Sequence, residues 1–137
     1  MTSCRFHDWC LTSILRDGER LGLTVASEDG SRSALIDLQE VRLIRMVDYS
    51  TQNIVENICD SSVHAIDRDC LSRLLVWMCS TADGGSWLSQ ESLGKITSEI
   101  EAGQAVLIAL TPSSGAELVA LCRSVTYRDS ISSRQIR

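Results

Sequence analysis

Short apolar segments separated by turn residues run from Trp9 to Cys59, and this pattern predicts a series of antiparallel strands. The second segment alternates apolar and polar side chains, as a strand with one buried face does. Asp17-Gly18 and Asp29-Gly30 separate the first three segments, and Asp-Gly supplies the positive φ that tight hairpin turns need. The expected strands are residues 9–16, 20–26, 33–38, 41–48 and 53–59.

Two of these strands carry further information about their surroundings. In the third, Asp37 lies between apolar neighbours of the opposite face and is expected to face solvent. The fourth is apolar on both faces, which is typical of a strand that is central in its sheet or covered on its second side. Its two apolar sets are Val41, Leu43 and Val47 on one face and Ile44 and Met46 on the other.

Helical spacing replaces the strand pattern after residue 66. Asp67 is placed to cap a first helix, because its carboxylate can accept hydrogen bonds from the free N–H groups of the first turn. A second helix is expected to start near Ser89, and Gly103 suits the left-handed position that follows a helix. The predicted buried stripes are Leu71, Leu74, Leu75 and Met78 in the first helix and Leu93, Ile96 and Ile100 in the second.

The last third of the chain returns to strand-like patterns. Residues 104–111 form a continuous apolar segment, which predicts a strand buried on both faces, and Pro112 to Gly115 predicts a turn. Residues 116–127 combine helix-forming and strand-forming halves, and the preceding tight turn favours a strand. We therefore expect a single α+β domain over residues 1–129, an antiparallel sheet of about six or seven strands with two helices packed on one face. A polar C-terminal tail is expected over residues 130–137.

Composition and charge narrow the function classes. The net charge of the 137-residue chain is −5, and its 13 basic residues include a single Lys. This balance argues against a nucleic-acid partner, which usually requires a basic face. No apolar segment approaches the roughly 18 residues of a membrane span, and polar residues precede Trp9 where a signal peptide would be apolar. We therefore expect a cytoplasmic protein without a membrane interaction.

The six cysteines are interpreted as thiols rather than as a disulfide framework. Cys10, Cys59, Cys79 and Cys122 lie inside apolar segments, where a cysteine behaves as a small buried hydrophobe. A cytoplasmic location would also keep them reduced. We expect these four thiols to be reduced and mostly buried.

No catalytic or metal-binding arrangement emerges from the motifs. Cys4, His7 and Cys10 are closely spaced, but structural zinc sites need four ligands and usually two paired motifs. A cysteine could pair with His7 or His64 as a nucleophile and base, although such a pair is recognised by geometry. His64 lies between Asp60 and the predicted helix and is interpreted as a surface histidine. We predict no catalytic residue, no metal and no cofactor.

Residues 48–55, Asp-Tyr-Ser-Thr-Gln-Asn-Ile-Val, combine a strand that ends in an acid, a short polar turn and a new strand. Over residues 9–58 this pattern resembles small bacterial α+β immunity proteins of polymorphic and contact-dependent toxin systems, and related YxiG-like proteins. The resemblance implies a protein that binds and neutralises a cognate toxin and performs no chemistry. It transfers no functional residues, because those families contact toxins through variable surfaces.

A toxin inhibitor of this kind would contact its protein partner through acidic residues that stay exposed in any version of the fold. The candidates are Glu28, Asp29, Asp48, Asp67, Asp69, Glu99 and Glu101. Two alternatives remain: a small hydrolase or transferase with an unplaced Cys/His or Asp site, and a structural or adaptor subunit. An acidic cluster beside an apolar patch would favour the inhibitor. A deep pocket that contains His64 and a cysteine would favour the enzyme. A long uncovered sheet edge that pairs between copies would favour the subunit.

Overall fold

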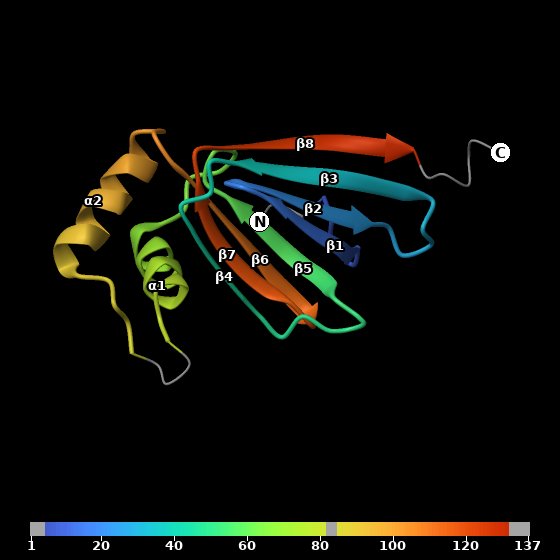
Figure 1. Ribbon diagram of the computed structural model, residues 1–137, viewed down its shortest axis with the longest axis horizontal. Coiled ribbons are helices and arrows are strands. Elements are labelled where there is room, and N and C mark those ends of the chain that lie inside the picture. The colour runs from blue at the N-terminus through green and yellow to red at the C-terminus, as the bar shows by residue number, and fades with distance from the viewer. Residues whose placement is uncertain (1–4, 82–84, 132–137) are drawn as a thin grey trace.

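The computed structural model describes residues 5–81 and 85–131, and within them eight antiparallel strands form one curved sheet (Figure 1). Two helices, α1 (Arg68–Met78) and α2 (Gln90–Glu101), connect the fifth strand to the sixth. The order across the sheet is β4-β7-β6-β5-β1-β2-β3-β8. In chain order the strands are β1 (Cys10–Asp17), β2 (Arg20–Ala26), β3 (Arg32–Gln39), β4 (Leu43–Val47), β5 (Ile54–Asp60), β6 (Val106–Ser114), β7 (Glu117–Cys122) and β8 (Ser124–Ile131).

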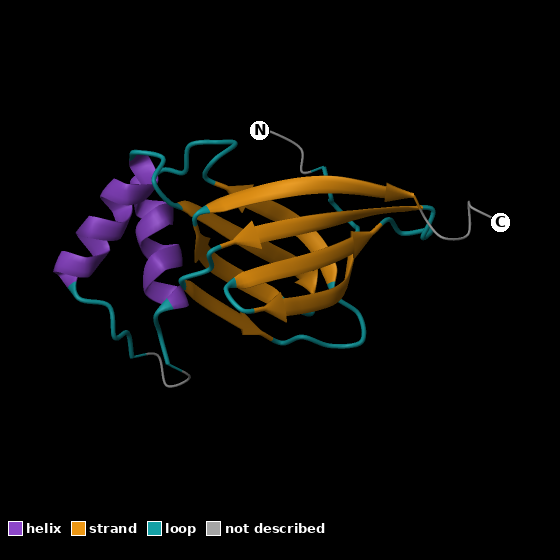
Figure 2. Cartoon of the chain, turned by 45° about the horizontal axis from the view of Figure 1, so that its top comes forward, coloured by secondary structure: helices purple, strands orange, loops and turns teal. Residues whose placement is uncertain are grey.

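Two short links require the sheet to curl. β7 lies next to one edge and β8 forms the other edge, yet Arg123 alone joins these strands. Residues 40–42 similarly join β3, near one edge, to β4 at the other. Neighbouring strands are about 4.8 Å apart and consecutive Cα atoms about 3.8 Å, so such links cannot cross a flat sheet. The sheet therefore wraps around on itself, with both helices gathered at one end (Figure 2).

Each face of β6 and β7 packs against a separate hydrophobic core. Ile108 and Leu110 point into the curled sheet, where they join apolar side chains from β1, β2, β3 and β5. Leu107 and Ala109 point to the other face and pack against α1 and α2. This arrangement confirms the prediction that residues 104–111 include a strand buried on both faces, and it places both helices against one face of the sheet.

The helix signals are confirmed by the structure. Asp67 Oδ1 accepts hydrogen bonds from the backbone N–H groups of Asp69 and Cys70 and so caps α1. Ser89 Oγ accepts from the N–H of Ser92 at the start of α2, and Gly103 has φ of 78° after its end. The residues buried on the two helices are Leu71, Leu75 and Met78 in α1 and Ile96 and Ile100 in α2, whereas Leu74 and Leu93 are half-buried.

The strand number and the last boundaries are corrected. The α+β class is confirmed, but the sheet has eight strands rather than six or seven, because Arg123 divides the last expected strand into β7 and β8. β6 continues through Pro112 and turns only at Gly115, whose φ is 83°. β8 extends to Ile131, so the expected tail from residue 130 begins inside a strand. Residues 132–137 of that tail lie outside the described residues.

Two expectations about surroundings were wrong. Asp37 does not face solvent: it is 3% exposed, and Arg20 on the neighbouring strand donates two hydrogen bonds to it from Nε and one from Nη2. The guanidinium lowers the pKa of this carboxyl group below its usual value. β4 is not central but forms an edge of the sheet, and only one of its faces is covered by α1.

The cysteine prediction is confirmed in part. Cys79 and Cys122 are fully buried, whereas Cys10 and Cys59 are half-buried. Cys10, Cys70, Cys79 and Cys122 are free thiols. Neither α1 nor α2 is long and apolar enough to span a bilayer, and no other helix in the described part of the chain is.

Candidate binding recess and acidic surface

A recess of about 460 Å³ opens where the chain passes from the sheet to the first helix. Its walls come from the end of β5, the loop of residues 61–67, the first turn of α1, β8 and residues 5–6. A volume of this size falls within the range of small-molecule and side-chain binding sites. The polar or ionisable groups of the wall that bear on chemistry are Cys59, Asp60, His64, Cys70 and Tyr127.

Asp60, the last residue of β5, is a buried carboxylate with hydrogen bonds to both oxygens. It is 4% exposed, and Oδ1 accepts from the backbone N–H and the hydroxyl of Ser62 at 2.8 and 2.6 Å. Oδ2 accepts from the hydroxyl of Tyr127 on β8 at 2.6 Å. A buried charge is tolerated only when such partners replace water. Asp60 therefore ties the loop and β8 to the end of β5, and all three of these segments contribute to the wall of the recess.

His64 lies on the loop that Asp60 organises. The backbone N–H groups of Val63 and His64 both donate to the carbonyl of Asp60 at 3.0 Å, which turns the chain sharply after β5. Val63 is 60% exposed and the His64 side chain is also exposed, so both stand at the rim of the recess. The sequence interpretation of His64 as a surface histidine in the link from sheet to helix is thus confirmed.

Two half-buried thiols lie in the same wall. The amide of Asn57 donates to Cys59 Sγ at 3.4 Å, and Cys70 follows the cap of α1. An adjacent base is one way to activate a thiol as a nucleophile, and within the described residues the ring of His64 makes no hydrogen bond to either sulfur. The described residues also contain no group of three or more His, Cys, Asp or Glu side chains placed to hold a metal ion. Apolar side chains such as Ile58 and Ile66 line the recess beside the polar groups, so it can bind an apolar group and offer it polar atoms.

Three of the seven predicted acids, Asp67, Asp69 and Glu101, lie at or beside this recess. Asp67 forms part of its wall, and Asp69 follows in the first turn of α1. Glu101, at the end of α2, accepts two hydrogen bonds from Arg68 at 2.7 and 3.0 Å, and this contact lowers the pKa of its carboxyl group. Glu99 lies two residues earlier on the same helix. We call Asp67, Asp69 and Glu101, which are all exposed, the helix-end acids.

Glu99 differs from the other candidates and corrects the expectation that all seven would be exposed. Its side chain is 24% exposed and Oε2 accepts a hydrogen bond from Arg42 at 3.1 Å. Glu99 faces the sheet side of α2 because Ile96 and Ile100, on the same face, pack into the helix core. It therefore holds the β3–β4 link against α2.

The remaining three candidates lie elsewhere. Glu28 and Asp29 are in the turn between β2 and β3, and Asp48 follows β4, so these three do not belong to the helix-end group. Hydrogen bonds from Ser31 and Ser27 lower the pKa of Asp29 to about 2, which shows a role in shaping its turn. Asp48 has φ of 61°, a left-handed conformation that asparagine and aspartate tolerate best among residues with a Cβ.

The residues that sequence reasoning missed are Asp60 and Tyr127. Their contact joins residues 67 positions apart in the chain. The local signal available was an acid at the end of a strand followed by two serines, which is typical of an Asx turn. Nothing local to Tyr127 identifies its partner, because the partner follows from the position of β8 in the sheet.

Comparisons of the chain with protein-family models, with curated proteins and with solved structures found no match.

Proposed function

We propose that this protein binds and neutralises a cognate bacterial toxin through the helix-end acids and the adjoining recess. The observation that carries the proposal is their proximity: Asp67 belongs to both, and exposed apolar Val63 and half-buried Ile66 lie in the same wall. Charge complementarity raises association rates, whereas burial of apolar groups slows dissociation. A surface that combines both is suited to tight protein binding.

The chemistry of this surface indicates the chemistry expected of the partner's surface. The helix-end acids favour a basic surface on the toxin, and the recess is large enough for an apolar or aromatic side chain from it. Arg68 neutralises part of the acidic charge through Glu101, so the attraction is moderate and should be strongest at low salt. The acids of the β2–β3 turn lie outside this surface and should contribute little.

Two triple variants with equal changes in charge test the proposal. The first, Asp67→Asn, Asp69→Asn and Glu101→Gln, neutralises the helix-end acids, and asparagine can still cap α1. Co-expressed with its cognate toxin, wild type should permit growth and this variant should not. Its association rate with purified toxin should fall by about tenfold at low salt and lose most of its salt dependence.

The matched control is Glu28→Gln, Asp29→Asn and Asp48→Asn, which should protect cells and associate as wild type does. Equal losses in the two variants would mean that net charge rather than this surface matters. Full protection by the first variant would reject the acidic surface. If wild type neither binds nor protects, the inhibitor proposal itself is wrong.

A small hydrolase or transferase is a second candidate, because one recess contains His64 together with Cys59 and Cys70. The variant His64→Gln separates the two functions. An inhibitor should keep its protection of cells when this exposed imidazole is replaced, since apolar contacts and acids remain. An enzyme that uses the imidazole as a base should lose about 100-fold or more of its activity.

A further inference from the structure

Strand β4 is an open edge of the sheet with little to prevent another strand from pairing with it. It pairs only with β7, and within the described residues its backbone makes no further hydrogen bond. Open edges usually carry charges that discourage such pairing. β8 at the opposite edge follows this rule with exposed Arg128 and Asp129, whereas Arg45 is the single charged residue of β4.

The inner core of the sheet continues to this edge and ends there without a cover. Ile44 and Met46 are opposite Ala120 and Leu118 of β7, which are completely buried in the inner core. At the edge, however, Ile44 is 37% exposed and Met46 36% exposed. Apolar side chains from one further strand would extend the core over them, because residues opposite each other in a sheet share a face.

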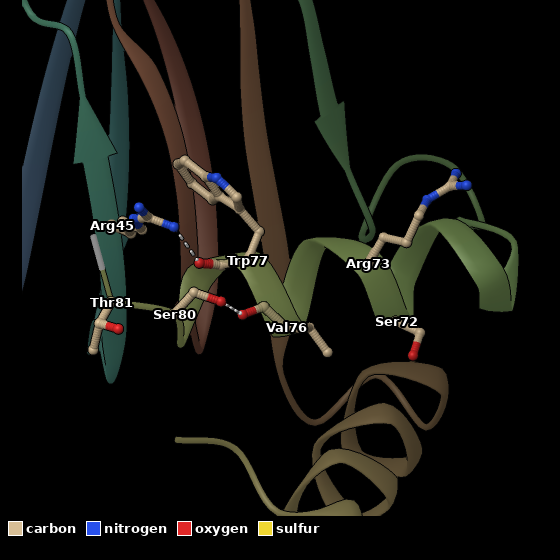
Figure 3. Close-up of a pocket in the computed structure, with 7 residues that line it drawn as sticks. All are labelled: Arg45, Ser72, Arg73, Val76, Trp77, Ser80 and Thr81. Atoms are coloured by element: carbon tan, nitrogen blue, oxygen red, sulfur yellow. Dashed lines mark hydrogen bonds between the residues drawn. The ribbon is translucent and has the colours of Figure 1, made fainter. Parts of the chain in front are cut away.

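Arg45 projects from the other face of β4 and is held in place by α1 (Figure 3). Its guanidinium carbon lies 4.3 Å from the centre of the Trp77 ring, and Nη1 donates to the Trp77 carbonyl at 2.8 Å. This contact places a cation at the C-terminal end of α1, where the helix dipole favours one. It explains the position of Arg45 but uses only part of its hydrogen-bonding capacity.

The surroundings of Arg45 favour an anion. Arg20, Arg42 and Arg68 each meet a carboxylate, but in the described part of the chain Arg45 has no acidic partner. A shallow recess of about 480 Å³ adjoins it, formed chiefly by α1. Arg73 also lines this recess but turns its guanidinium away from Arg45, and the lining includes no carboxylate (Figure 3).

We propose that an extended segment of a partner protein adds to β4 as a further strand, with an acidic residue opposite Arg45 and apolar residues on either side of it. Backbone hydrogen bonds to the open edge would supply affinity. The acidic side chain would enter the recess beside Arg45, and the apolar ones would cover Ile44 and Met46. This surface is separate from the helix-end acids and has the opposite charge preference, so it does not rest on the proposed toxin binding.

Labelled peptides with a Val-Glu-Val or a Val-Lys-Val centre in an otherwise identical extended sequence test this inference. The glutamate peptide should bind, slow the amide exchange of residues 43–47, and bind about tenfold more tightly than the lysine peptide. N-methylation of alternate peptide nitrogens should abolish binding, since it removes the donors that pair with β4. Affinity for the glutamate peptide should fall with salt.

Variants of Arg45 make the test specific. Arg45→Glu should reverse the preference between the two peptides, and Arg45→Gln should remove it without reversing it. The matched control, Arg128→Glu on the opposite edge strand, should leave both affinities unchanged. Unfolding curves for each variant establish that the fold persists, and Arg45→Gln remains informative if Arg45→Glu does not fold.

Several outcomes would overturn the inference. The first is that the glutamate peptide fails to bind at a concentration of about 1 mM, since a dissociation constant of that size corresponds to a binding free energy of about 4 kcal/mol. The second is equal affinity for the two peptides. Binding that survives N-methylation, or exchange protection at β8 instead of β4, would overturn it as well. If Arg45→Gln still prefers the glutamate peptide, the charge preference arises at another site, and the inference is wrong.

Discussion

Removal of the Tyr127 hydroxyl tests whether the Asp60 contact holds the recess together. In Tyr127→Phe, Oδ2 of a carboxylate that is 4% exposed loses a hydrogen bond of 2.6 Å. Hydrogen bonds to charged groups contribute about 1.5–3 kcal/mol, so the free energy of unfolding should fall by about 2 kcal/mol. With a urea slope of about 1.5 kcal/mol/M for a domain of this size, the midpoint should shift by about 1.3 M.

The protein contains its own control, because its second tyrosine is Tyr49. Tyr49 is 49% exposed, so Tyr49→Phe should change stability by less than about 0.5 kcal/mol. In a double-mutant cycle with Asp60→Asn, the losses of unfolding free energy from the Asp60 and Tyr127 substitutions should deviate from additivity by about 1 kcal/mol. Amide exchange at Val63 and His64, which donate to the Asp60 carbonyl, should accelerate in Tyr127→Phe. If Tyr127→Phe costs no more than Tyr49→Phe, Asp60 does not organise the recess in the way described.

Three further predictions concern the fold that carries both surfaces. Gly115→Ala should cost about 2–4 kcal/mol, because its Cβ would lie 2.5 Å from Asn53 Oδ1 at a φ of 83°, whereas Gly103→Ala has open space and should cost about 1 kcal/mol. Equal unfolding midpoints for the two variants would contradict this. Thiol titration at pH 8 should leave Cys79 and Cys122 unreactive in the native state and detect all six thiols in denaturant. Burial raises the pKa of Cys122 to about 12, above its unfolded value, so its contribution to stability is complete below about pH 8.5 and is lost as pH rises toward 12. Cys122→Ala should reduce this alkaline loss, and an unchanged pH profile would refute the assignment.

Local chemistry determines the parts of the fold that the sequence predicted. Caps and tight turns depend on a few adjacent residues, so Asp67, Ser89 and Gly103 could be placed without knowledge of the rest of the chain. The buried stripes of the helices followed from spacing alone. The strand count failed at Arg123, because only Arg123 and Ser124 separate the apolar end of one strand from the β-branched start of the next, and neither Gly nor Pro marks a turn there.

The position of each strand in the sheet could not be predicted, and both candidate surfaces depend on it. β4 has the composition of a central strand, yet the short link from β3 carries it across to an edge. The recess requires β8 to pass near the end of β5, which results from pairing between β8 and β3 along their full length. Sequence reasoning located the loop with His64 and three of the acids beside it, but not the cavity next to them.

Helix α1 connects the two surfaces, and this affects how variants of either should be interpreted. Its N-terminal end carries Asp67 and Asp69, and its C-terminal end contacts Arg45 through the Trp77 carbonyl. Both placements are those that the helix dipole favours, each by about 0.3–1 kcal/mol, so every one of these charges also stabilises the helix. The 11-residue helix is about 16 Å long, hence a change at one end acts on a segment that supports the other. A variant that loses binding therefore needs a control variant of equal stability that is altered at the opposite end of α1. The residue is assigned to the interface only if this control still binds. The triple variant at the helix-end acids and the Arg45 variants provide this comparison for each other.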